Sequence, residues 1–224
     1  MQLLHLDSSI TGEQSVSRLL TAEVVAAQRA MNPGIEVIYR DLAAAPAMHL
    51  SPAHIAVFQG AAVKSDAIGP DLALGAKYLD ELFAAAVIVI GAPMHNFTIP
   101  SQLKAWVDRI VVAGKTFSYT ERGPIGLLPA GKKAFIAASS GGFYSSDSPV
   151  KFMEHGESYL RGVLAHIGIT DVRVIRAEGI GLGPETRARA IDVARGAVSE
   201  VSAERRTARV DRSERATTSV AQFD

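Results

Sequence analysis

The chain has 224 residues, of which 48% are hydrophobic and 21% charged, and its 23 basic residues balance 23 acidic ones. This length allows one compact domain with a large core, and the neutral balance gives no electrostatic reason to expect a nucleic acid or an anionic membrane as partner. Because cysteine is absent, disulfides, thiolate catalysis, iron–sulfur clusters and cysteine-ligated zinc are excluded. The first residues lack the pattern of a signal peptide and no window approaches a membrane span, so we expect a cytoplasmic protein.

Strand and helix signals alternate along the first part of the chain. Apolar residues at helical spacing, from Leu20 to Met31, are stopped by Asn32-Pro33-Gly34. An irregular stretch rich in alanine and proline, residues 43–51, follows the second strand. The predicted elements are a strand at 2–7, a helix ending near 31, a strand at 35–39, and helical segments near 52–60 and 70–83.

The third predicted strand is the most distinctive stretch. Val87 to Ile90 is uncharged and β-branched and is followed by Gly91, which is typical of a strand buried on both faces of a parallel sheet. The loop over residues 91–100 contains two prolines, and Ser101 is the predicted N-cap of a helix with apolar residues at helical spacing. Because ligands bind beyond the carboxyl ends of strands in open α/β sheets, this loop is the prime candidate site.

The second half of the chain continues the alternation after one interruption. Residues 115–120, closed by a turn at 121–124, form either a small hairpin or an excursion over the site. The remaining predicted elements are a strand at 134–138, a helix near 149–167, a strand at 172–177 and a last helix after Pro184-Glu185. Five strands with helical crossovers predict an α/β fold, a flavodoxin-like doubly wound parallel sheet of order 2-1-3-4-5 with helices on both faces.

The end of the chain differs in composition from the rest. From Glu204 onward large apolar residues nearly vanish, and arginines alternate with acidic residues. We therefore expect one domain over residues 1–203 and a charged extension over 204–224 that is frayed or disordered, because it offers little apolar surface to offset the entropy of ordering.

The loop after the first strand is rich in hydroxyl groups. Ser9, Ser15 and Ser17 stand before or at a helix start, where free backbone N–H groups and the positive end of the helix dipole suit a phosphate monoester. Two alternatives stay open: Ser15 or Ser17 could serve only as the helix cap, and Arg18 could hold the phosphate or be a solvated residue of the first turn.

The loops after the third and fourth strands have different chemistry. Met94 to Phe97 combine a polarizable side chain, hydrogen-bonding groups and a ring, which suits a flat heteroaromatic ligand. His95 lacks a second ligand at metal-binding spacing, so no metal site is predicted. Gly141-Gly142 would let the backbone approach a ligand closely, or form an ordinary tight turn. The three loops together outline a mononucleotide site.

A glycine-rich segment near the end of the domain resembles a dinucleotide fingerprint. Gly179 to Pro184 lies between a strand and a helix, but the position of the third glycine holds Pro184. No further strand follows, and the motif requires one. We therefore expect no separate dinucleotide fold, and NAD(P)H would visit the exposed face of the bound ring.

Dispersed motifs give the chain a family resemblance over roughly residues 1–200. It resembles the FMN-dependent, NAD(P)H-using azoreductases, which are related to the quinone reductases. The motifs are Asp7-Ser8-Ser9 with Ser15-Val16-Ser17, Pro93-Met94-His95-Asn96-Phe97 with Gln102-Leu103-Lys104, Thr116 to Glu121 with Gly123-Pro124, Lys132-Lys133-Ala134 leading to Ser139-Ser140-Gly141-Gly142, Gly168 to Val172, and Ala177 to Ile180.

This resemblance implies non-covalent FMN in a homodimer with each site at the subunit interface. It implies three groups of cofactor-binding residues: Ser9, Ser15, Val16 and Ser17 at the phosphate, Pro93, Met94, His95, Asn96 and Phe97 at the ring, and Ser139, Ser140, Gly141 and Gly142 at the opposite polar edge. The residues expected to act in catalysis are Asn96, Gly141 and Gly142, as N–H donors to the reduced ring, and Tyr119, as part of the substrate pocket.

The implied reaction is ping-pong: NADH or NADPH gives a hydride to FMN and leaves, and a quinone or azo compound is then reduced in the same place. Family members often carry Tyr where His95 stands and His where Tyr144 stands, which leaves the roles of both side chains open. Two alternatives remain, a flavodoxin-type electron carrier, which zero net charge disfavours, and an FMN-binding module without turnover.

Overall fold

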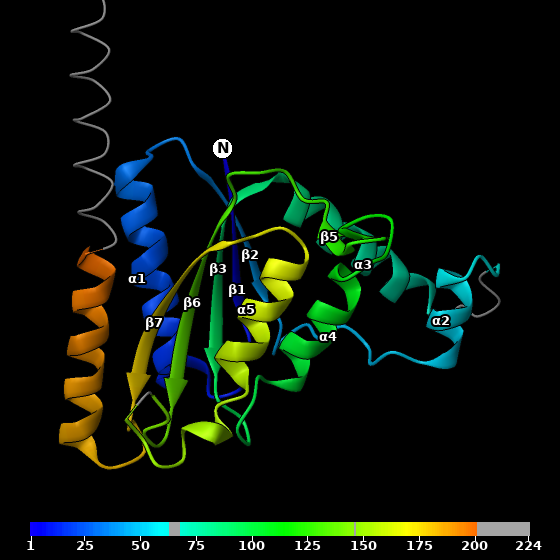
Figure 1. Ribbon diagram of the computed structural model, residues 1–224. Coiled ribbons are helices and arrows are strands. Elements are labelled where there is room, and N and C mark those ends of the chain that lie inside the picture. The colour runs from blue at the N-terminus through cyan, green and yellow to red at the C-terminus, as the bar shows by residue number, and fades with distance from the viewer. Residues whose placement is uncertain (63–67, 146, 201–224) are drawn as a thin grey trace, which may run out of the picture.

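The computed structural model describes residues 1–62, 68–145 and 147–200. Its main sheet has five parallel strands in the order β2-β1-β3-β6-β7 (Figure 1), which confirms the predicted order 2-1-3-4-5. The strands are β1 (Gln2–Asp7), β2 (Glu36–Asp41), β3 (Ala85–Pro93), β6 (Lys133–Ser140) and β7 (Asp171–Glu178).

Helices cover both faces of this sheet, as predicted, and each face has its own core. Side chains alternate across a strand, so Leu3 and Val87 face one core while Leu4 and Ile88 face the other. The first core lies under α1 (Val16–Met31) and a helix over residues 184–200; the second lies under α3 (Gly69–Ala84), α4 (Ser101–Ile110) and α5 (Gly156–His166) (Figure 1). The short α2 (Pro52–Phe58) lies outside these layers.

Three predicted boundaries were wrong. β3 runs to Pro93, which has Ser139 as its partner in β6, so Gly91 to Pro93 belong to the strand and not to the loop. The predicted cap Ser101 lies inside α4, where its hydroxyl contacts the side chain of Gln102, and Pro100 takes the cap position. α5 begins at Gly156 because a separate short turn, Lys151–Met153, precedes it.

Strands β4 (Phe117–Thr120) and β5 (Gly123–Gly126) form an antiparallel hairpin, which confirms the first of the two alternatives for this segment. The hairpin packs beside the end of α5: the rings of Phe117 and His166 are 4.3 Å apart, and the N–H of Leu128 donates to the carbonyl of Ile167 at 3.2 Å. Ile167 lies shortly before the first residue of β7, so the hairpin that contacts it lies at the edge of the sheet where the strands begin, the amino edge (Figure 1).

Two further findings concern the described residues alone. No described helix combines the length and apolar character that crossing a bilayer requires, and no group of three or more potential ligand side chains there could hold a metal ion. The predicted domain boundary at 203 and the charged extension over 204–224 lie outside the described residues.

Candidate active site

The loops that follow β1, β3, β6 and β7 meet at the carboxyl edge of the sheet around a hollow of about 560 Å³. The hollow joins eight of the predicted cofactor-binding residues: Ser9, Ser15, Val16, Pro93, Met94, His95, Ser139 and Gly141. Four lining residues were not predicted: Thr11, Gln14, Ile180 and Arg187. This size is within the usual range of small-molecule and cofactor sites.

The first end of the hollow is the start of α1. The Ser15 hydroxyl accepts the backbone N–H of Arg18 at 3.2 Å, so Ser15 is the helix cap and also lines the hollow. Ser17 is fully buried and its hydroxyl lies 3.1 Å from that of Ser15. The backbone N–H groups of Val16 and Ser17 have no acceptor among the described residues, as expected at a helix start. This end therefore offers an anion several donors.

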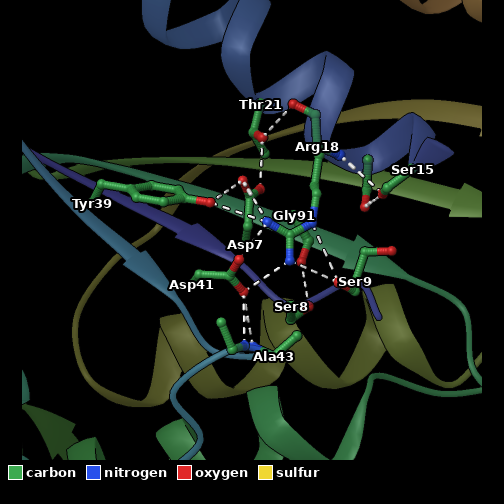
Figure 2. A network of polar contacts seen from close by, with 12 residues as sticks. Asp7, Ser8, Ser9, Ser15, Arg18, Thr21, Tyr39, Asp41, Ala43 and Gly91 are labelled. Carbon is green, nitrogen blue, oxygen red and sulfur yellow. Dashed lines mark hydrogen bonds and ion pairs between the residues drawn. The ribbon is translucent and has the colours of Figure 1, made fainter. Parts of the chain in front are cut away.

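Arg18 lies behind this end and is fully engaged within the protein (Figure 2). Its guanidinium donates to both carboxylate oxygens of Asp41 at 2.8 Å and twice to the carbonyl of Ser9, at 2.8 and 3.3 Å. A further bond of 3.1 Å reaches the Tyr39 hydroxyl. The bond to Arg18 holds the pKa of Asp41 below its usual value. Arg18 thus fixes the Ser9 loop against β2.

Asp7 anchors the same network from the end of β1 (Figure 2). Its buried carboxylate accepts the hydroxyls of Thr21 at 2.8 Å and Tyr39 at 3.1 Å. Burial, together with the neighbouring Asp7, raises the pKa of Tyr39 to about 12, so this phenol stays protonated. Gly91 is needed beside it, because a Cβ there would lie 2.9 Å from Asp7 Oδ1.

The loop after β3 is a two-residue turn between His95 and Thr98, which exchange backbone hydrogen bonds of 2.8 and 3.2 Å. Asn96 and Phe97 have positive φ values of 47° and 72°, and the N–H of His155 holds the Phe97 carbonyl at 3.0 Å. Both turn residues are exposed and follow the lining residue His95 in the chain without lining the hollow themselves, and neither N–H has an acceptor among the described residues. Burial lowers the pKa of His95, so its imidazole is neutral at pH 7.

The loop after β6 is held by the loop after β7. The N–H groups of Gly181 and Gly179 donate to the carbonyls of Gly141 and Gly142, each at 3.0 Å, and Ser140 Oγ also donates to Gly142 at 2.9 Å. The N–H groups of Gly141 and Gly142 have no acceptor in the described part of the chain. The glycine-rich segment that resembled a dinucleotide fingerprint therefore supports this loop.

Relatives of known family share this architecture. A family model described as having a flavodoxin-like fold matches residues 1–201. An FMN-dependent NADH:quinone oxidoreductase 2 from Bradyrhizobium diazoefficiens is 52% identical over 203 residues, which cover 91% of this chain and all of the relative. The chain belongs to the FMN-dependent NADH:quinone oxidoreductase family. The predicted family resemblance and the flavodoxin-like fold are thus confirmed.

Two more comparisons place the chain within this family. An FMN-dependent NADH:quinone oxidoreductase from Azospirillum brasilense is 49% identical over 199 residues, or 87% of this chain and 94% of the relative. The crystal structure of an azoreductase from Bacillus anthracis str. Sterne matches with a TM-score of 0.80 and 26% identity, and covers 90% of this chain and 98% of that one. The likeness therefore spans nearly the whole domain.

Several predicted site residues do not line this hollow. Ser140 and Tyr144 line a second hollow of about 530 Å³, which shares Pro93, Met94 and Ser139 with the first. Four others line neither hollow of the described chain, although each adjoins a lining residue or its loop: Ser17, Asn96, Phe97 and Gly142. Tyr119 is 75% exposed on the hairpin at the amino edge and lines neither hollow. Within one chain, the structure does not bring Tyr119 to the other predicted residues, and its catalytic role stays a prediction.

Proposed function

We propose that the chain is an FMN-dependent NADH:quinone oxidoreductase that also reduces azo compounds. One observation carries this assignment: the loops after β1, β3 and β6 all contribute lining residues to a single hollow at the carboxyl edge of the sheet, and each of these loops has N–H groups without an acceptor among the described residues. The names of the relatives supply the donor, NADH, and the acceptor class, quinones, and the azoreductase of similar structure supports azo compounds as acceptors.

The chemistry of the donors fits FMN at both ends of the hollow. The free N–H groups of Val16 and Ser17 and the Ser9 and Ser15 hydroxyls suit a phosphate, and each hydrogen bond to a charged oxygen contributes about 1.5–3 kcal/mol. The helix dipole adds only about 0.3–1 kcal/mol. At the other end, Met94 and His95 supply the wall for a flat ring. The predicted cofactor-binding roles of these residues rest on this fit.

FMN, when bound, supplies the hydride-transfer chemistry. The loops of the chain would hold the ring, and the N–H groups of Asn96, Gly141 and Gly142 would be the hydrogen-bond donors available to its polar edge. The neutral imidazole of His95 adds no positive charge to this site. NADH and the acceptor would bind in turn at this same site, and we therefore expect ping-pong kinetics.

We also infer a homodimer, because the family resemblance implies that Tyr119 lines the substrate pocket, whereas within one chain Tyr119 lines neither hollow. Exposed apolar side chains lie at both ends of the sheet: Ile125 and Leu127 are 49% and 39% exposed at the hairpin, and Phe143 and Phe152 are 51% and 68% exposed near the second hollow. Such side chains suit a self-complementary interface. The cytoplasmic location expected from the sequence stays a prediction.

An assay of the purified full-length chain tests the function directly. We expect a yellow protein whose flavin absorbance bleaches with NADH under anaerobic conditions and which reduces a quinone, and an azo dye, without a partner protein. NADH and NADPH should be compared in parallel. A colourless preparation that does not bind added FMN contradicts the proposal, and FMN binding without quinone turnover favours the electron carrier or the module without turnover.

A further inference from the structure

Two arginines lie near the first end of the hollow, and only one of them has donors to spare. A guanidinium has five N–H donors. Those of Arg18 match five contacts, with Ser9 (twice), Tyr39 and Asp41 (twice). No donor of Arg18 is left for a ligand.

Arg187, in the first turn of the helix over residues 184–200, is different. It lines the hollow beside Thr11, Gln14 and Ser15. One of its Nη2 hydrogens donates to the carbonyl of Gln14 at 2.7 Å, which places the guanidinium next to the cap of α1. In residues 1–62, 68–145 and 147–200, no acceptor is found for its Nε or Nη1 and no carboxylate forms an ion pair with it.

The position of Arg187 is also unfavourable for the stability of its own helix. The first turn of a helix carries a partial positive charge, which disfavours a cation there. An uncompensated guanidinium at such a place, beside free N–H groups of a second helix start, makes this end of the hollow strongly attractive to a dianion. The charge of the Arg187 guanidinium lies at the same end of the hollow as the hydroxyl-rich loop after β1, which suits a phosphate.

We propose that Arg187 binds the phosphate of FMN and supplies the counter-charge that the serine loop lacks. The inference rests on the proposed function, since it concerns the cofactor of that same site. The guanidinium keeps its bond to Gln14 and turns its remaining donors to the phosphate oxygens. Arg187 is therefore a cofactor-binding residue, while Arg18 positions the loop from behind.

Flavin binding to the full-length apoprotein, followed by fluorescence quenching, tests this without reference to activity. FMN and riboflavin differ only in the phosphate, so their dissociation constants are measured side by side for the wild type, Arg187→Ala, Arg187→Glu and Arg189→Ala. Arg189 is the matched control, because it is exposed on the same helix and does not line the hollow. Each measurement is repeated at low and high salt.

We expect Arg187→Ala to raise the dissociation constant of FMN about tenfold or more and to leave that of riboflavin within about twofold. Arg187→Glu should weaken FMN binding further, the salt dependence of FMN binding should fall in both variants, and Arg189→Ala should behave as the wild type. Equal losses for FMN and riboflavin, or no loss for FMN, overturn the inference. A wild type that binds neither flavin overturns the proposed function and this inference together.

Discussion

Phe97 combines an unfavourable backbone conformation with a place in the turn between His95 and Thr98, which we propose contacts the flavin ring. Its φ of 72° lies in the left-handed region, which costs a residue with a side chain about 1–2 kcal/mol. Phe97→Gly and Phe97→Ala both remove the ring, so their difference isolates the backbone. Allowing for the greater entropy of unfolded glycine, we expect the Gly variant to be more stable by about 0.5–1 kcal/mol, measured by urea unfolding.

The control is a position where glycine should be less stable than alanine. Ala188 is exposed on the helix over residues 184–200, where replacement by glycine costs about 1 kcal/mol. If glycine is also the less stable choice at position 97, the strain assigned to this turn is wrong.

At the level of single residues, the sequence predicted residues that line the hollow where the signal for them is local. Two such local signals are a hydroxyl before a helix start, as at Ser15, and a glycine pair after a strand, as at Gly141. Arg187 does not: it lies 172 positions after Ser15 in the chain and reaches the first loop only because the last helix packs beside α1 (Figure 1). A charged residue in the first turn of the last helix was the only signal.

Between elements, a buried ion pair fastens the helices of the second core. Asp71 of α3 accepts from Arg109 of α4 at 2.5 and 2.9 Å, from the N–H of Met48 at 2.7 Å, and lies 3.1 Å from His54 of α2. Asp71→Ala leaves the guanidinium buried without its partner, so we expect a loss of about 3–5 kcal/mol in the free energy of unfolding. Asp108→Ala, which removes an exposed pair with Lys104, should cost less than about 1 kcal/mol.

The same carboxylate predicts how stability depends on pH. Burial alone would raise the pKa of Asp71, but the bonds from Met48 and Arg109 outweigh it and hold the pKa below 3.8. The stabilisation is therefore complete above that unfolded-state value and is lost as the pH falls through the lower folded-state value. Between about pH 5 and pH 3 the wild type should lose more stability than Asp71→Asn; equal losses in urea unfolding contradict this.

The ends of helices and strands were predictable where proline or glycine marks them in the sequence, and less predictable elsewhere. Asn32-Pro33-Gly34 ends α1 as expected, since proline and glycine act locally. The end of β3 was missed because Pro93 usually argues against a strand; here it is the last residue of β3, and the N–H of Met94 continues the pairing to the Ser139 carbonyl at 2.7 Å.

For the molecule as a whole, cofactor binding should appear as thermal stability. A ligand that binds only the folded chain at 100 times its dissociation constant adds about 2.7 kcal/mol. For a domain of this size that corresponds to a rise in Tm of about 5–10 °C. We expect this rise with FMN and a smaller one with riboflavin at the same concentration, measured by differential scanning calorimetry; identical shifts would mean that the phosphate end contributes nothing.

The global topology was the most predictable feature, because alternating strands and helices leave few arrangements that obey right-handed crossovers. The location of the hairpin was not predictable in the same way. The hairpin packs against the domain through a contact between Gly126 and Gly168 that is so close that a Cβ on Gly126 would overlap the backbone of Gly168. Hydrophobic periodicity in the sequence does not predict a contact of this kind.

The position of hairpin β4–β5 at the amino edge separates two kinds of evolutionary change. Tyr119 lines neither hollow, so substitutions at Tyr119 leave the lining of the carboxyl-edge hollows unchanged within one chain. In the proposed homodimer, where Tyr119 of one copy lies beside the hollow of the other, changes in the hairpin alter which compounds are accepted while the cofactor-binding loops keep their residues. Grafting residues 115–126 from one family member onto another is therefore a rational way to exchange the range of acceptor compounds that the enzyme reduces.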